Sequence, residues 1–452
     1  MHCLLRTLAA MAALFHLTFS AIVKHEVKSL PGWDLPLPSR QYSGYLPVDA
    51  ATKHYRFLHY WVSESMSNPA TDPVVLWLTG GPGCSSMAGY FLEMGPILMN
   101  TSTSDVQLLA NPYTWNQNAT LIFLESPAGV GFSYSTNKAD YITNDTMTAE
   151  DNFRFLVNFF AAYPEYATND FYISGESYAG IYIPTLAEVI RTSKSNINLK
   201  GLLVGNGCVG NKVGGCGDSE QSVPIKIKFV YGHGLISEGI FSELQDRCGL
   251  KLNEIGVYCK EMLETVDVRT NFINVYDIYA PCIQSDSDIF WTAATEHVRR
   301  LRDLGFTECG APGGLLKYMN QPDVRAAIHV ESAAELGDWK FCAKLNYTGN
   351  VDSLLGVYPD LIAKYRVLIY SGDVDACVPY TGSEEWTSGL GYDFGVGWRP
   401  WDVNGRPVGY VTEYKANGFT FATLRGAGHQ VPLYKPMESL AMFQRFLANV
   451  PL

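Results

Sequence analysis

The run Asp170-Phe171-Tyr172-Ile173-Ser174-Gly175-Glu176-Ser177-Tyr178-Ala179-Gly180 predicts a short buried strand followed by a sharp turn, and residues 181–191 predict the helix after it. A strict Gly-x-Ser-x-Gly pattern is not met, because the second glycine comes one place late, at Gly180. Small residues around Ser177 still let the backbone bend sharply, which lifts the hydroxyl clear of the sheet and points the following N–H groups at a developing oxyanion. Ser177 is therefore a candidate nucleophile, and the alternative is a serine at an ordinary helix N-cap.

Two later segments supply an acid and a histidine in the chain order of an α/β hydrolase, which is nucleophile, acid, histidine. The apolar run 366–371 is followed by Gly372-Asp373-Val374-Asp375, and the run 419–424 is followed by Gly426-Ala427-Gly428-His429. Both follow the C-terminal end of a predicted strand, where open α/β sheets place their chemistry. The acid would orient the imidazole, and the histidine would take the serine proton. Each residue alone could belong to a turn, but the three in this order predict a catalytic triad.

Composition favours a globular chain with a sizeable core, since 47% of the 452 residues are hydrophobic and 17% are charged. The net charge of −12 argues against nucleic acid as a partner and suits an acidic compartment, although plain solubility explains it equally well.

The N-terminal residues predict a cleaved secretory signal peptide over 1–20, because Arg6 precedes an apolar run that is too short to span a membrane comfortably. No second apolar run approaches transmembrane length, so we expect no membrane anchor. Glycosylation sequons support passage through the secretory pathway, and they lie at Asn100, Asn118, Asn144 and Asn346.

The cysteine content also favours passage through the secretory pathway. Of the ten cysteines, Cys3 would leave with the signal peptide, and the odd remainder leaves at least one thiol unpaired in an oxidising compartment. The spacing is not that of a zinc site, and we expect neither a metal nor a cofactor.

Other apolar runs predict the rest of the sheet. Residues 42–45 and 55–62 predict an opening antiparallel pair, and buried strands are expected at 74–79, 121–124 and 202–204. Apolar residues at helical spacing predict a helix before Pro164; they are Phe153, Leu156, Val157 and Phe160.

The character of the chain changes after Gly207, where most of the mature cysteines gather and strand alternation fades. We expect an α/β-hydrolase fold with a mixed, mostly parallel central sheet. Its core would have two parts, 21–205 and 313–452, separated by a helical, disulfide-linked cap insertion at 206–312.

Several motifs together resemble those of the serine carboxypeptidases, most closely the lysosomal cathepsin A (protective protein) branch, over nearly the whole mature chain. Besides the three segments above, they are Gln41-Tyr42-Ser43-Gly44-Tyr45-Leu46, Trp77-Leu78-Thr79-Gly80-Gly81-Pro82-Gly83-Cys84-Ser85-Ser86 and Glu125-Ser126-Pro127-Ala128-Gly129-Val130-Gly131-Phe132-Ser133-Tyr134.

The resemblance implies roles for particular residues. The triad would be Ser177, Asp375 and His429, with Asp373 left as a turn residue or as a residue that supports the triad without contacting the substrate. The oxyanion hole would be the backbone N–H groups of Gly81 and Tyr178. The carboxylate of the substrate's C-terminus would be held by Thr79, Gly80, Glu93 and Glu176. Thr79 departs from the family pattern, which has an asparagine there, and a hydroxyl offers fewer donors than an amide.

The resemblance also suggests a disulfide pattern. The pairs would be Cys84–Cys342, Cys248–Cys259 and Cys282–Cys309, with Cys208–Cys216 remaining as a local pair and Cys377 as the free thiol near the site. The branch is nicked to a two-chain form, and the polar segment around Arg299-Arg300 is where a nick would fall; the alternative is a solvated helix.

The predicted function is release of C-terminal amino acids from peptides with a free C-terminus, through an acyl-enzyme, at acidic pH. One alternative is a serine carboxypeptidase-like acyltransferase, in which an alcohol replaces water. Another is a non-catalytic role as a protective, stabilising partner of other lysosomal enzymes. The lysosome or vacuole and the extracellular space both stay open, as does the oligomeric state, with a homodimer among the alternatives.

Overall fold

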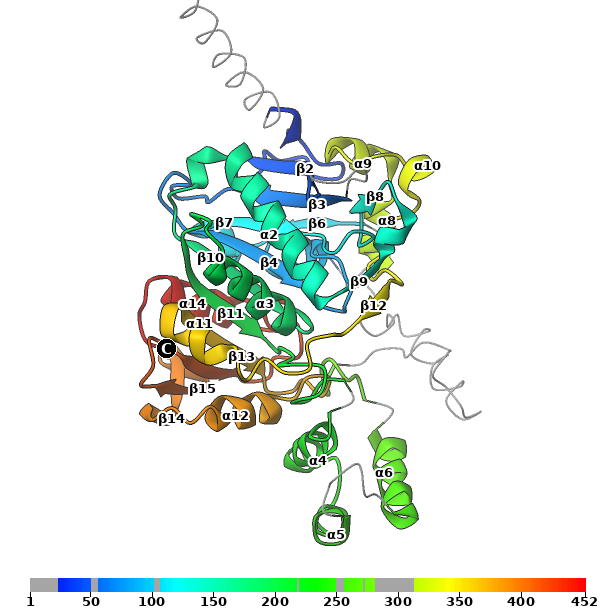
Figure 1. Ribbon diagram of the computed structural model, residues 1–452, viewed down its shortest axis with the longest axis vertical. Coiled ribbons are helices and arrows are strands. Elements are labelled where there is room, and N and C mark those ends of the chain that lie inside the picture. Colours follow the sequence, from blue (N-terminus) through cyan, green and yellow to red (C-terminus); the bar gives the residue numbers. More distant parts are fainter. Residues whose placement is uncertain are drawn as a thin grey trace, which may run out of the picture.

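Parallel strands form the centre of the protein, and helices cover both faces of the sheet (Figure 1). The computed structural model describes residues 23–49, 56–100, 106–217, 219–248, 256–270, 273–280 and 313–452. Three predictions fall outside these residues: the signal peptide, the Cys282–Cys309 pair and the nick near Arg299-Arg300.

One sheet contains twelve of the described strands, in the spatial order β1-β2-β3-β7-β4-β10-β11-β13-β16-β15-β14, with β8 paired to β3. The six strands from β7 to β16 are parallel, and the strands flanking them pair antiparallel. The mixed sheet is thus confirmed, with its parallel part at the centre. The strands are β1 (Glu26–Val27), β2 (Gln41–Pro47), β3 (Arg56–Ser63), β4 (Val74–Thr79), β7 (Thr120–Leu124), β8 (Tyr134–Ser135), β10 (Phe171–Glu176), β11 (Leu199–Gly205), β13 (Arg366–Gly372), β14 (Phe394–Val403), β15 (Arg406–Tyr414) and β16 (Thr420–Leu424).

Two small sheets lie outside the main one, and they pair β5 (Ile97–Met99) with β6 (Leu108–Ala110) and β9 (Ile142–Asn144) with β12 (Asn346–Thr348). The helices are α2 (Asp145–Ala162), α3 (Ala179–Thr192), α4 (Ser222–Gly232), α5 (Glu238–Cys248), α6 (Val257–Thr270), α8 (Gly313–Met319), α9 (Pro322–Ala327), α10 (Ala333–Leu336), α11 (Tyr358–Lys364), α12 (Tyr380–Gly389), α13 (Val431–Tyr434) and α14 (Pro436–Leu447). Single turns are η1 (Gly89–Glu93), η2 (Trp115–Gln117), η3 (Lys138–Tyr141) and η4 (Pro164–Tyr166).

The continuous apolar sequence of β4 explains its place inside the sheet. All six of its residues are buried. Because successive side chains of a strand point to opposite faces, Leu76 packs in the apolar core under α2 and α3. Trp77 packs on the other face, in the core with η1 and α14. Two cores, one on each face, therefore hold the parallel strands and fix where their C-terminal ends lie.

The start of helix α2 is fixed by a side-chain cap. Asn144 is its N-cap, and its side-chain oxygen accepts a hydrogen bond from the backbone N–H of Met147 at 2.9 Å. Of the predicted apolar positions, Leu156 is fully buried, whereas Val157 is 43% exposed, so Val157 was wrongly grouped with the core-facing residues.

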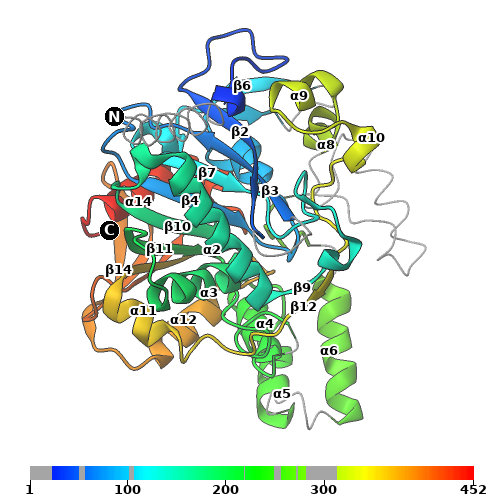
Figure 2. The same cartoon turned by 45° about the horizontal axis from the view of Figure 1, so that its top comes forward.

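Helices α4, α5 and α6 project from the main body (Figures 1 and 2). The disulfide Cys248–Cys259 joins α5 to α6, and Cys208–Cys216 lies just before α4. These helices also bury a small apolar cluster of their own, made of Ile227, Phe229, Val230, Ile236, Leu244 and Val266. The projecting part thus has a modest core in addition to its disulfides. Within the described ranges, every helix is too short or too polar to cross a lipid bilayer.

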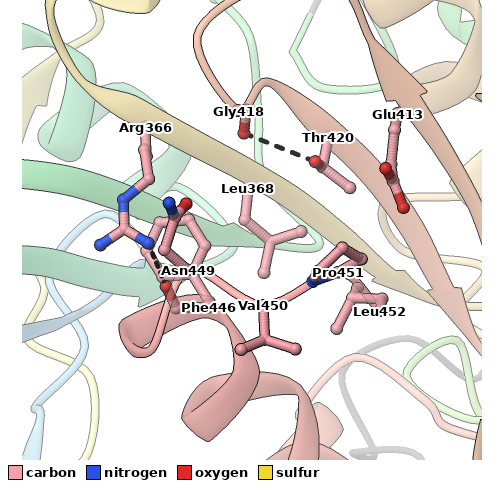
Figure 3. A pocket seen from close by; sticks show the side chains of 10 residues that line it. All are labelled: Arg366, Leu368, Glu413, Gly418, Thr420, Phe446, Asn449, Val450, Pro451 and Leu452. Atoms are coloured by element: carbon pink, nitrogen blue, oxygen red, sulfur yellow. Dashed lines mark hydrogen bonds between the residues drawn. The ribbon is translucent and has the colours of Figure 1, made fainter. Parts of the chain in front are cut away.

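A small cavity of about 130 Å³ lies beside the C-terminal tail (Figure 3). Arg366 and Thr420, which begin β13 and β16, both line it. The Arg366 guanidinium lies 5.1 Å from the centre of the Phe446 ring and donates to that residue's carbonyl. The cavity is therefore at the N-terminal ends of the parallel strands, the opposite edge from Asp375 and His429.

Candidate active site

Ser177 occupies the turn between β10 and α3, with a φ of +63°. This left-handed conformation is costly for a serine, by about 1 kcal/mol, and persists only where neighbouring contacts hold it. The Ser177 N–H donates to the carbonyl of Gly205 at 3.0 Å, and the Ser177 carbonyl accepts from Gly180 and Cys208. A Cβ on Gly180 would lie 2.3 Å from the Cys208 carbonyl, so only glycine allows this close approach. Gly180, which comes one place later than in the strict motif, is therefore still needed to form the turn.

Asp375 and His429 form a buried hydrogen-bonded pair, with 2.7 Å between Asp375 Oδ2 and His429 Nδ1. The carboxylate holds the proton on Nδ1 and leaves Nε2 as the basic atom. The pair follows β13 and β16, and Ser177 follows β10; since all three strands are parallel, the residues lie at the same edge of the sheet. Among the described residues, Ser177 Oγ makes no hydrogen bond to His429, and the contact between a nucleophile and its base often tightens only when substrate binds.

Asn206 is a member of the site that sequence reasoning missed. It follows β11, and its Nδ2 donates to Asp375 Oδ2 at 2.7 Å while its Oδ1 accepts from the Gly372 N–H at 3.0 Å. Two backbone N–H groups, of Cys377 and Val378, also donate to the Asp375 carboxylate. A signal existed, because Asn206 follows a predicted strand end just as Asp375 does.

Asp373, the other acid of the motif, does not reach the histidine. Its Oδ1 accepts from the Gly426 N–H at 2.6 Å, which ties together the loops after β13 and β16. This is the turn position that the sequence assigned to it.

A segment after α6 also touches the site. The carbonyl of Tyr276 accepts from the His429 N–H at 2.7 Å, and the two rings lie 5.2 Å apart. The Ala376 N–H donates to the carbonyl of Val275 at 2.9 Å, beside Asp375. Residues 273–280 thus contact both loops that present the Asp–His pair, and no sequence motif indicates this.

The loop after β4 lies directly against the turn at Ser177. A Cβ on Gly80 would lie 2.3 Å from the Tyr178 backbone nitrogen and 2.8 Å from the Ser177 Cβ, so a side chain at this position is excluded. This contact places the backbone around Gly80 and Gly81 beside the Tyr178 N–H.

Two buried glutamates meet beside the Asp–His pair. Glu93 ends η1 and Glu176 ends β10; they are 1% and 3% exposed. Burial raises the pKa of Glu93 to about 7. Burial, and next the neighbouring Glu93 charge, raise the pKa of Glu176 well above its usual value. Two neighbouring buried carboxyls cannot both ionise cheaply, so one of them keeps its proton. Gln430 Nε2 donates to Glu93 Oε1 at 3.3 Å. Gln430 was also missed, although it directly follows His429.

Thr79 lies opposite Glu176 in the β4–β10 register, on the buried side of the sheet that faces η1. Its Oγ1 accepts from Trp77 Nε1 at 3.0 Å. The hydroxyl proton of Thr79 is left to donate elsewhere.

Cys377 is a free cysteine, and its sulfur, an Asp375 oxygen and a His429 nitrogen all lie within 4.8 Å of one another. Burial, and next the Asp375 charge, raise the pKa of this thiol to about 12. The disulfide Cys84–Cys342 ties the loop after β4 to the segment before β12. Of the sequon asparagines, Asn118 and Asn346 are exposed, and Asn100 and Asn144 are half-buried.

A parallel sheet that presents serine, aspartate and histidine at one edge, in this chain order, defines an α/β hydrolase. The crystal structure of Kex1(Δ)p, a prohormone-processing carboxypeptidase from Saccharomyces cerevisiae, has the same fold, with a TM-score of 0.73 at 22% identity over 95% of this chain and 96% of that one.

The chain belongs to the serine carboxypeptidase family, whose profile matches residues 31–449. It is 39% identical to serine carboxypeptidase-like 20 of Arabidopsis thaliana, over 97% of this chain and 95% of the relative. It is 39% identical to serine carboxypeptidase 1 of Hordeum vulgare (94% and 92%) and 38% identical to the lysosomal protective protein of Mus musculus (94% and 94%). The plant and mouse relatives are thus about equally similar to it.

Proposed function

We propose that this serine carboxypeptidase releases C-terminal amino acids from peptides at acidic pH, through an acyl-enzyme on Ser177. The observation that carries the acid preference is the buried Glu93–Glu176 pair next to His429. A protonated carboxyl donates to the carboxylate of a substrate's C-terminus, whereas two ionised carboxylates repel it.

Ser177 Oγ attacks the last peptide carbonyl while His429 Nε2 takes its proton. The N–H groups of Gly81 and Tyr178 stabilise the oxyanion. The C–N bond then breaks and His429 gives the proton to the leaving amine; in the second half, His429 activates water, which releases the acyl group. Asp375 keeps the imidazole in the required tautomer throughout.

Thr79, the Gly80 backbone, Glu93 and Glu176 would hold the substrate's terminal carboxylate. Support comes from the register of Thr79 against Glu176 and from the contact of Gly80 with the turn at Ser177. The Glu93–Glu176 pair favours hydrolysis of peptides over acyl transfer between substrates that lack a free carboxylate.

The pH dependence tests this assignment. We expect KM for a blocked dipeptide with a free C-terminus to rise by up to about 10-fold between pH 6 and pH 8, as Glu93, whose pKa is about 7, ionises. KM for the matching C-terminal amide should stay within about 2-fold, because it carries no negative charge. Glu176→Gln, which remains a neutral donor at every pH, should flatten the rise.

The contribution of this pair to folding stability, like its contribution to substrate binding, is greatest at low pH. An acid whose pKa is raised in the folded state stabilises the folded state fully below the unfolded pKa of 4.5, and this contribution is lost as the pH rises through about 7.

In the kinetic test, equal pH profiles of KM for the acid and amide substrates would rule out the carboxylate-binding role, even in a fully active enzyme.

The free thiol of Cys377 predicts that the enzyme is inhibited by some thiol reagents and not by others. Mercurials, which bind thiols tightly, should lower activity at least about 10-fold, because the bound metal would lie against Asp375 and His429. Iodoacetamide needs the thiolate and should react slowly, since only about one thiol in 10⁵ is ionised at pH 7 when the pKa is about 12. Cys377→Ser should keep its activity in the presence of a mercurial; equal inhibition of this variant would contradict the prediction.

We also propose passage through the secretory pathway, to the lysosome or vacuole or to the outside of the cell. Three disulfides in the described residues support an oxidising compartment, where such bonds persist. Asn118 and Asn346 are exposed and thus accessible for glycosylation. The cap role of residues 206–312 is likewise our proposal, supported by the contacts of Tyr276 and Val275 with the loops of the site.

A further inference from the structure

A buried carboxylate outside the triad holds the residue that follows Ser177. Asp145, the first residue of α2, is fully buried. Its Oδ1 accepts hydrogen bonds from the hydroxyls of Tyr178 and Tyr347, each at 2.8 Å. Its Oδ2 accepts from the backbone N–H groups of Asn350 and Val351, at 2.7 and 2.8 Å, and from Asn211 Nδ2 at 3.1 Å.

The five donors satisfy this carboxylate completely. A buried carboxylate is costly unless it is hydrogen-bonded, and here every contact is a donor. The donors come from three separate parts of the chain: the turn at Ser177, the loop at Asn211, and strand β12 with the residues that follow it. Asp145 is therefore a junction of several segments, and one of them carries the nucleophile.

Tyr178 is held at its tip and along its ring. Its hydroxyl reaches Asn211 Oδ1 at 2.9 Å as well as Asp145. Its ring packs edge-on against Tyr182 at 5.4 Å and against Tyr347 at 5.8 Å. The side chain is thus hydrogen-bonded at its hydroxyl and packed along its ring, and its backbone nitrogen directly follows Ser177.

We propose that Asp145 is a positioning residue, which fixes Tyr178 and thereby aims the Tyr178 N–H at the oxyanion of the tetrahedral intermediate. This inference rests on the proposed function, which places that N–H in the oxyanion hole. An oxyanion-hole donor works only when its geometry is fixed before the charge develops. A misplacement of about 1 Å in a reacting constellation can cost about 100-fold in rate.

The chain offers a matched pair of variants. Tyr178→Phe and Tyr347→Phe each delete one hydroxyl that donates at 2.8 Å to the same oxygen of Asp145. Both should lower the thermal midpoint by a similar amount. Only Tyr178 is attached to the turn that carries Ser177, so the two variants separate a role in catalysis from a role in stability alone.

Three measurements distinguish the roles: the kcat and KM for a blocked dipeptide, the affinity for a blocked amino-acid aldehyde, and the affinity for the corresponding alcohol. The aldehyde adds to Ser177 and forms an oxyanion, whereas the alcohol binds without one. Tyr178→Phe should lower kcat and aldehyde affinity about 10-fold each, with KM and alcohol affinity within about 2-fold. Tyr347→Phe should keep all four values within about 2-fold of the wild type.

Asp145→Asn extends the test, because an amide turns one acceptor into a donor that faces the hydroxyls. It should lower kcat as Tyr178→Phe does, and the double variant should show less than the sum of the two effects. If the Asp145 variant does not fold, the tyrosine pair still decides. Equal losses of kcat in both tyrosine variants, or a change in KM alone, would overturn the positioning role. A wild-type enzyme that neither cleaves the peptide nor binds the aldehyde would instead overturn the proposed function, and this inference with it.

Discussion

Replacement of Ser177 by alanine should lower kcat by at least about 10⁴-fold while KM for blocked peptides stays within a few-fold. The substitution removes only Oγ. The turn itself depends on backbone contacts, in which the Ser177 N–H donates to Gly205 and the Ser177 carbonyl accepts from Gly180 and Cys208. Alanine at a φ of +63° carries strain similar to that of serine. The variant should therefore fold and bind substrate but lack the attacking atom.

Release of the C-terminal amino acid from a blocked dipeptide measures this loss. Labelling with a phosphonyl fluoride, which reacts with activated serines, should modify the wild type once and the variant not at all. Ser174→Ala is the matched control, because Ser174 lies on the same strand and is fully buried. A Ser177→Ala enzyme that kept more than about 1% of the wild-type kcat would show that another residue is the nucleophile.

The centre of the fold was predictable because its signals are local. A strand buried on both faces must be apolar throughout, as in β4, so its sequence alone identifies it. The strands predicted at 202–204, 366–371 and 419–424 follow the same logic, and each overlaps an observed strand. Parallel strands end at one edge of the sheet, so the positions of Asp375 and His429 after two such strands were enough to predict that the two residues lie close together.

Other elements depend on neighbours that are distant in sequence. Strand β14 is exposed over most of its length and lies at the edge of the sheet, so it lacks the apolar pattern that would have revealed it. Val157 has the spacing of a core residue, yet the surface of α2 on which it lies is not covered.

The motif at 125–134 shows why residue roles are harder to predict than strands. Glu125 is fully buried and accepts hydrogen bonds from Trp339 Nε1 at 2.8 Å, from the Phe132 N–H at 2.7 Å and from Ser85. His59 Nδ1 lies 2.9 Å from the same carboxyl group. The motif therefore contacts three distant segments of the chain, at His59, Ser85 and Trp339, and only the folded chain shows which ones. Asn206 and Asp145 act in the same way, through partners far away in the sequence.

Replacement of Asp375 by asparagine should lower kcat about 10⁴-fold with little change in KM. The Asp375 carboxylate accepts from four donors, which are His429 Nδ1, Asn206 Nδ2 and two backbone N–H groups. An asparagine has one acceptor oxygen and an NH₂ group that must face at least one of these donors. If the NH₂ donates to His429 Nδ1, the imidazole proton moves to Nε2, and the histidine can no longer accept the proton of Ser177.

The neighbouring acid provides the control for this experiment. Asp373→Asn should cost less than about 10-fold, because Asp373 accepts from the Gly426 N–H at 2.6 Å and does not contact the histidine. The two variants place the same chemical change two residues apart on one loop, so the ratio of their kcat values measures what contact with the imidazole contributes. A larger loss in Asp373→Asn than in Asp375→Asn, with both variants folded, would exchange the roles of the two acids.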